Sequence, residues 1–338
     1  MTSSSTTPVP ARQLHRGVVV AGVVASGIVV CVVALLAAGG APKPLPAGLH
    51  GAGLPVSWAV PVLRLLADAA AIVCGGAVLA AVLLLKPEEG GKLGAQGLKA
   101  MQDGAVAASV WAVASIGGLI ATASVILGLP LSHLPEQAAV AGQLDQVRAL
   151  AVAVALTAVL AVVLSGTRTV ASARVALVLT AAALVGPLLT GHGAIERTAF
   201  WTVLATASLV VHVFAATTWV GGLWAVVRYR GAVDRFSRLA LGCAVTIGAT
   251  GLLTAEIHLD GREGGWGLIT QWVTTGYGAL VFAKAAAFAV LVTIGWWHRR
   301  ATLPALADRP ALFYRLAAVE LLVMAGTVGL AVALSRTP

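Results

Sequence analysis

Long apolar stretches without interruption dominate this chain and restrict it to one class of fold. Nine of them come close to or exceed the roughly 20 residues that an α-helix needs to cross a bilayer. They cover residues 17–39, 57–85, 104–128, 147–165, 174–190, 199–227, 238–257, 276–296 and 313–334. The strands of a membrane barrel would alternate polar and apolar residues, and these stretches do not. We therefore predict an all-α, polytopic transmembrane helix bundle of about nine spans in a lipid bilayer.

The scarcity of charged residues excludes a water-soluble protein. Only 10% of the 338 residues are charged and 59% are hydrophobic, whereas a soluble domain carries about 25% charged residues. Disordered chains are poor in apolar residues, so disorder is excluded as well. Composition alone therefore favours the same membrane class as the long apolar stretches.

The distribution of basic residues predicts the orientation of the bundle. With the N-terminus in the cytoplasm, fifteen of the 22 Lys and Arg residues fall in inner segments and five in outer segments, while Arg64 and Lys284 lie within spans. Cytoplasmic loops of membrane proteins carry an excess of Lys and Arg. We therefore predict a cytoplasmic N-terminus and an outside C-terminus. The net charge of +9 is then loop charge, and no nucleic-acid partner is expected.

The order of segments suggests three parts. Residues 1–16 form a cytoplasmic polar tail, residues 17–190 the first five helices, and residues 191–338 a four-helix membrane domain. The first apolar stretch is longer than the core of about 7–15 residues found in signal peptides, which predicts a retained helix. Cleavage near residues 37–39 is the alternative.

Ionisable residues inside the predicted spans are the first candidates for function, because a charge there costs about 2.5–3.5 kcal/mol on insertion scales. Arg64 and Asp68 are four residues apart on one helix, where they can pair on one face. Counted along their helices, His212 and Glu320 fall at a similar depth. Together with Lys284, these charges fit either a buried salt-bridge network or a transport path, and both interpretations stay open.

Histidines gather on the predicted outer side. The four in outer loops or at outer helix ends are His50, His133, His192 and His258. His15 and His298 are predicted to be cytoplasmic, and His212 alone to lie within a span. Single surface histidines are usually only solvated, but four on one face of a chain so poor in polar residues favour metal capture. Imidazole suits copper and zinc.

The outer end of the seventh span carries a second group of metal-ligand types. Glu256 and Asp260 are four residues apart and face one way if the helix continues, with His258 roughly opposite. If the helix stops at 257, the loop can bring His258 beside Glu256. Carboxylate and imidazole suit a borderline divalent metal better than Cu(I). None of the three methionines is predicted on the outer side, so a methionine-rich copper relay is not expected.

The second half of the chain carries several motifs in a fixed order: Thr190-Gly191-His192-Gly193-Ala194, the stretch from His212 to Leu223 with its Trp-Val-Gly-Gly-Leu, Phe236-Ser237-Arg238, the stretch from Thr275 to Lys284, Arg315 and Glu320. With these motifs it resembles the copper resistance protein D family of bacterial inner-membrane proteins. The resemblance covers about residues 185–335. The first five spans are similar in number and hydropathy only.

The resemblance implies copper tolerance or copper uptake across the cytoplasmic membrane, beside an extracytoplasmic CopC-like copper donor. The positions that it carries over are His192, His212, Trp219, Tyr277, Lys284 and Glu320. Combined with the residue patterns above, the predicted metal ligands are His192, His212, His258 and Glu256. The predicted transport path comprises Trp219, Tyr277, Lys284, Glu320, Arg64 and Asp68. The copper ion is the bound or transported species.

Two other functions compete with a copper permease. One is a copper-delivery or oxidase-assembly partner that transports nothing. The other is a membrane electron-transfer cytochrome, which is disfavoured because two haem-ligating histidines at similar depth are needed and only His212 is predicted to be deep. No haem is therefore expected. The chain has no Walker spacing and no His-Glu-x-x-His motif, so it is not expected to be an enzyme.

Overall fold

The computed structural model describes residues 11–44, 51–189, 199–258, 266–306 and 308–337. Its long helices are α1 (Ala11–Ala37), α2 (Leu54–Leu79), α3 (Ala95–Leu127), α5 (Asp145–Gly166), α6 (Val170–Leu189), α7 (Ala199–Tyr229), α8 (Val233–His258), α10 (Gly276–Trp297) and α11 (Pro310–Leu334). Two π-helical turns, Ala80–Leu84 and His298–Thr302, prolong α2 and α10. The shorter helices are α4 (Ala138–Ala141) and α9 (Trp266–Thr274), with single 3₁₀ turns at Glu89–Gly91, Leu131–His133 and Pro135–Gln137.

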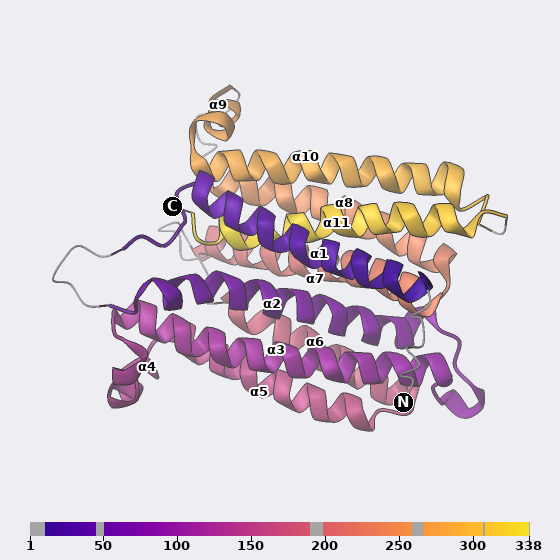
Figure 1. Ribbon diagram of the computed structural model, residues 1–338, viewed down its shortest axis with the longest axis horizontal. Helices are drawn as coiled ribbons and strands as arrows, with labels where there is room; N and C mark the ends of the chain where they lie inside the picture. The colour runs from indigo at the N-terminus through magenta and orange to yellow at the C-terminus, as the bar shows by residue number, and fades with distance from the viewer. Residues whose placement is uncertain (1–10, 45–50, 190–198, 259–265, 307, 338) are drawn as a thin grey trace, which may run out of the picture.

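The prediction of an all-α membrane bundle is confirmed. Within the described residues, nine helices are long and apolar enough to cross a membrane, and they run side by side along one axis (Figure 1). Every predicted stretch corresponds to one of them. The ends differ most in α3, which begins at Ala95 rather than at 104, because a polar first part continues the helix beyond its apolar section.

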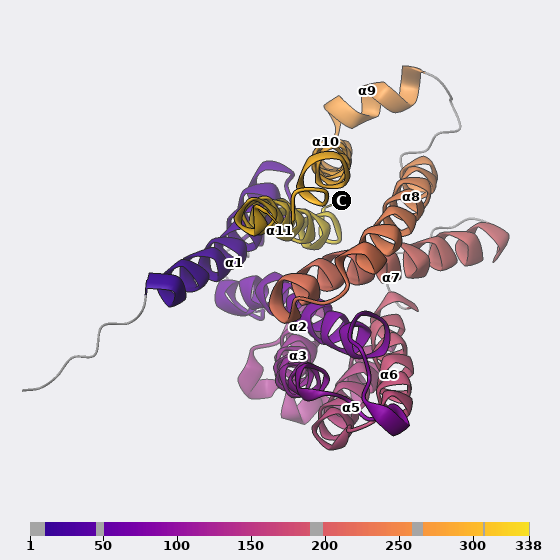
Figure 2. The ribbon, with the colours of Figure 1, turned by 90° about the vertical axis from the view of Figure 1, so that its right-hand side faces the viewer.

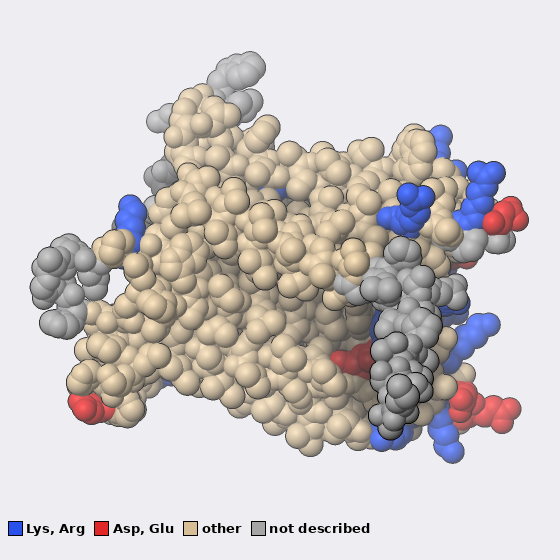
Figure 3. Space-filling model, viewed as in Figure 1, with Lys and Arg blue, Asp and Glu red and all other residues tan. Residues whose placement is uncertain are grey.

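Basic side chains gather at one end of the bundle. Figure 3 shows most of the visible Lys and Arg side chains at the end where α2 leads into α3, with few at the opposite end. This charged end is the one that the sequence predicts to be cytoplasmic, and between the two ends the visible surface is almost free of charge.

Helices α2 and α7 lie at the centre of the bundle. Seen end-on in Figure 2, α3, α5 and α6 lie on one side of them, while α1, α10 and α11 lie on the other. The contact between α2 and α7 is close because both helices carry glycine there. A Cβ atom on Gly221 would lie 2.5 Å from the carbonyl oxygen of Ile72. Small residues let helix backbones approach one another in lipid, where dispersion contacts rather than water drive association.

A polar cluster joins α3 to α7 at the charged end. The Tyr229 hydroxyl donates a hydrogen bond of 2.9 Å to Asp103, and Arg228 forms an ion pair of 3.0 Å with the same carboxylate oxygen. Tyr229 is 3% exposed, so Asp103 accepts a hydrogen bond from a phenol that has little access to water.

Replacing Asp103 with alanine is expected to destabilise the protein by about 1–3 kcal/mol, the usual cost of leaving a buried donor without its acceptor. The unfolding midpoint of the purified protein in detergent measures the change. Glu136→Ala is the matched control, because Glu136 is an exposed carboxylate whose 3.7 Å pair with His133 is expected to contribute little. Equal midpoints for both variants would contradict a structural role for the Asp103 cluster.

Candidate functional site

The predicted outer metal ligands are only partly covered by the structure. His192 lies outside the described residues, and so do the side chains of Glu256 and His258. The backbone places both residues in the last turn of α8, which ends at His258. Among the side chains that are described, no group of three or more His, Cys, Asp or Glu residues is arranged to hold a metal ion. The outer metal site stays a prediction.

His212 lies at the contact between α7 and α8. Its ring nitrogen Nδ1 is 2.9 Å from the hydroxyl oxygen of Thr250, and that hydroxyl donates its own proton to the carbonyl of Thr246 at 2.7 Å. Thr250 therefore accepts the hydrogen bond from Nδ1, which must carry the proton. In the neutral ring, this leaves the lone pair on Nε2. A histidine fixed in this way presents Nε2 as a metal ligand.

Lys284 of α10 is close enough for its charge to act on the His212 ring. The two residues come from helices that the sequence separates by 72 positions, and both are half-buried. An ammonium group next to an imidazole disfavours a second cation at the same place.

An aromatic pair lies next to this polar group, towards the charged end. Trp219 is two turns beyond His212 on α7, and Phe288 is one turn beyond Lys284 on α10. The two rings meet edge to face with their centroids 6.2 Å apart, and Trp219 is only 5% exposed. The two rings therefore form an apolar contact between α7 and α10.

A buried histidine lies nearer the charged end, where the sequence predicts none. The Nε2 atom of His298 is 3.3 Å from a carboxylate oxygen of Glu320 on α11, and the two residues are 7% and 3% exposed. The prediction that His212 alone lies within a span is wrong, and His298 is buried rather than solvated. The eighth span continues through the π-helical turn His298–Thr302, which turns His298 into the bundle.

The pairing of Glu320 also differs from the expected arrangement. His212 contacts Thr250 of α8 and Glu320 contacts His298 of α10, so the two residues have separate partners, and their similar depth stays a prediction. The sequence offers no local signal for either partner. His298 precedes two arginines and looks like the end of a helix, and Thr250 is one of several threonines in an Ala- and Gly-rich helix.

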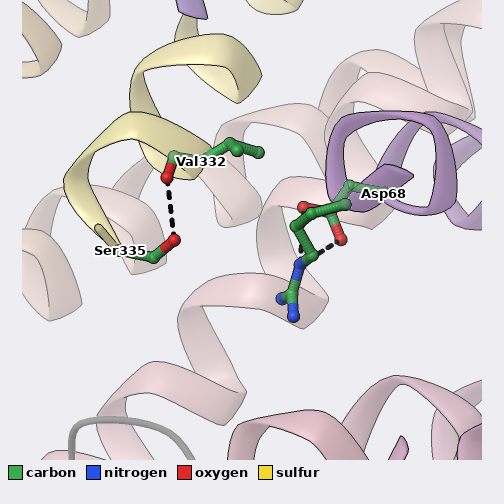
Figure 4. A network of polar contacts seen from close by, with 4 residues as sticks. Asp68, Val332 and Ser335 are labelled. Atoms are coloured by element: carbon green, nitrogen blue, oxygen red, sulfur yellow. Dashed lines mark hydrogen bonds and ion pairs between the residues drawn. The ribbon is translucent and has the colours of Figure 1, made fainter. Parts of the chain in front are cut away.

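Arg64 and Asp68 form the intrahelical pair that their spacing predicts. Arg64 Nε lies 3.0 Å and 3.1 Å from the two carboxylate oxygens of Asp68, and both side chains are about one-third or more exposed. Figure 4 shows this pair on α2 near the last turn of α11, where the Ser335 hydroxyl donates to the Val332 carbonyl. Tyr277 lies in the first turn of α10, at the end opposite the charged one. Arg64 and Asp68 therefore lie on a helix other than those that position His212 and His298, whereas Tyr277 and His298 lie at opposite ends of α10 and its π-helical extension.

The chain was compared with families, with curated proteins and with solved structures. Residues 230–334 match the model of the family described as copper resistance protein D. No match to the chain was found among the curated proteins, and none among the solved structures. The matched stretch contains α8, α9, α10 and α11 and so includes Thr250, Lys284, His298 and Glu320. Helix α7, with His212 and Trp219, precedes it.

Proposed function

Since residues 230–334 are a copper resistance protein D domain within a multi-pass membrane protein, we propose that this protein moves copper ions across the bacterial cytoplasmic membrane. The observation that carries the proposal is His212. Its imidazole is held inside a span by Thr250, in the tautomer that leaves Nε2 to a metal ion. A metal-ligand group at that depth is expensive to place in a membrane unless it serves a path through it.

The proposed path runs from the outer side to the charged end. On the outer side, the ion passes from a CopC-like donor to His192, His258 and Glu256. His212 then takes the ion into the bundle. Lys284 acts on the His212 ring through its charge, so a protonated Lys284 disfavours a copper ion at His212. The Trp219–Phe288 pair then separates His212 from the buried carboxylate of Glu320. None of these steps requires the protein to be an enzyme.

Depth distinguishes transport from the alternative role of copper delivery to an oxidase. A delivery partner needs ligands on the outer surface, where it meets the donor and the acceptor. A half-buried histidine, a buried histidine and a buried carboxylate within the spans serve no such exchange. Their position favours a path across the membrane over a docking surface.

Copper flux into sealed liposomes tests the proposal. Purified protein is reconstituted around a trapped copper-sensitive dye, and Cu²⁺ or Cu⁺ is added outside. We expect dye quenching at least about tenfold faster than in protein-free liposomes, since an ion does not cross lipid unaided. Absence of flux for both oxidation states in either direction would overturn transport and leave copper delivery as the function.

A further inference from the structure

The buried pair of His298 and Glu320 is not explained by helix packing alone. We propose that these two side chains form a copper-binding site near the charged end of the bundle, with His298 Nε2 and the Glu320 carboxylate as ligands. The choice of copper as the ion rests on the proposed function. The site itself rests on the geometry of α10 and α11.

Hydrogen bonding fixes the tautomer of His298. Its Nδ1 atom lies 2.6 Å from the hydroxyl oxygen of Thr302, and that hydroxyl donates to the backbone carbonyl of His298 at 3.1 Å. With the single hydroxyl proton of Thr302 directed at that carbonyl, Nδ1 is the donor in their mutual bond. The neutral ring therefore has its lone pair on Nε2. A ligating histidine is usually oriented in this way, with its other nitrogen donating to a neighbouring oxygen.

The lone pair of Nε2 faces a carboxylate, so two acceptors meet in a place without water. Nε2 is buried and makes no hydrogen bond, although the Glu320 oxygen is 3.3 Å away. Two buried acceptors repel each other unless a cation lies between them. The pair therefore requires either a metal ion between the two groups or a proton on one of them.

The distance and the direction of the contact favour the metal ion. Two ligands about 2.0–2.2 Å from one ion, at angles of about 90–110°, are roughly 2.8–3.5 Å apart, and the observed 3.3 Å falls in this range. A shared ion lies off the line that joins its ligands. A proton held by either atom would instead point at the other atom and form a hydrogen bond, which this geometry lacks.

The surrounding charges leave room for a cation. Arg299 donates to the carbonyl of Ser237 on α8, and Arg300 stacks over Trp296 with its guanidinium carbon 5.1 Å from the ring centroid. Arg315, on the same helix as Glu320, is exposed. The ring of Phe313 packs 5.1 Å from that of His298 and covers the pair with apolar surface. The nearest arginines in sequence therefore have other partners or face outwards.

Two protein ligands suit an ion in transit. A conducting site must bind well enough to be entered and weakly enough to be left, and a full set of four protein ligands would instead hold the ion as a structural site does. Nitrogen and oxygen ligands favour Cu²⁺ over Cu⁺, which prefers sulfur. The charged end thus receives a divalent ion from the bundle and releases it.

Copper binding to the purified protein tests the site. Wild type, His298→Gln, Glu320→Gln and the double variant are titrated with Cu²⁺ in detergent, and bound copper is counted after gel filtration. We expect each single variant to lose one equivalent and the double variant to lose the same one. Nitrogen hyperfine lines in the Cu²⁺ spin-resonance spectrum should weaken with the loss of His298. His15→Gln, a histidine that precedes the first candidate span, is the matched control and should bind as wild type does.

A milder variant keeps the test decisive if the buried pair cannot be replaced without unfolding. Thr302→Val retains the size of the side chain and removes the oxygen that orients His298, so we expect affinity for that equivalent to fall about 10–100-fold. Unchanged stoichiometry and spectra in folded variants would overturn the site and leave a proton as the bridging cation. The flux assay is independent: binding without flux removes transport but keeps the site, whereas flux with unchanged binding in His298→Gln removes the site only.

Discussion

Replacing His212 with alanine is expected to abolish copper accumulation by cells while the protein is still made and inserted. Alanine removes the imidazole, the only metal-ligand side chain that this part of α7 contributes. Folding should survive, because the Thr250 hydroxyl keeps its own hydrogen bond to the Thr246 carbonyl when the ring is gone. Copper per cell measured by mass spectrometry, normalised to the protein in the membrane fraction, gives the result.

Two further variants serve as comparisons for His212→Ala. Thr250→Val keeps the imidazole and removes the oxygen that Nδ1 donates to, so we expect uptake about 10–100-fold lower than in wild type. His15→Ala should accumulate copper normally. If His212→Ala cells accumulate as much copper as wild type, His212 is not on the path, whatever the chain does with copper elsewhere.

Replacing Gly221 with alanine is expected to prevent the bundle from folding. The added Cβ would lie 2.5 Å from the Ile72 carbonyl oxygen and 2.9 Å from the Gly76 nitrogen, and a Cβ on Gly76 would in turn meet the Gly221 carbonyl. All of these neighbours are backbone atoms, so no side chain can rotate away and the two helices must separate. Overpacking costs about 1–3 kcal/mol when side chains can adjust, and more is expected here.

Gel filtration and thermal unfolding in detergent measure this effect. Gly118→Ala is the matched control, because Gly118 lies in the middle of α3 with no atom within 4 Å of an added Cβ. We expect Gly118→Ala to elute and melt as wild type does, and Gly221→Ala to aggregate or to be degraded in cells. A stable, monodisperse Gly221→Ala protein would show that α2 and α7 do not cross as closely as described.

The number and type of helices were predictable because the bilayer imposes a length that apolar stretches must match. Helix ends were less predictable. The sequence at a membrane interface does not show whether the helix ends there or continues as a helix beyond it. The sequence Trp296-Trp297-His298-Arg299-Arg300 has aromatic residues followed by cations, which is typical of a membrane interface. The helix continues through that interface, and this continuation is why His298 was assigned to the wrong environment.

The candidate site was predictable only for residues that are unusual in a membrane. His212, Lys284 and Glu320 were identified because ionisable groups are rare within spans. Thr250 and Thr302 were missed, because threonine is common in such helices and its hydroxyl usually bonds to a carbonyl one turn earlier. Both do so here, and both thereby become acceptors for a histidine. Such a role depends on which helices are neighbours, and hydropathy does not reveal that.

The packing of α1 against α11 has a consequence for how this protein is made. The Ser26 hydroxyl of α1 donates to the Leu322 carbonyl of α11, across 296 positions of sequence. A Cβ on Gly329 would meet the Gly27 carbonyl, so the two backbones touch there. Because α1 is synthesised long before α11, it stays in lipid without this partner until α11 is inserted. The contact between α1 and α11 therefore forms late in the assembly of the bundle.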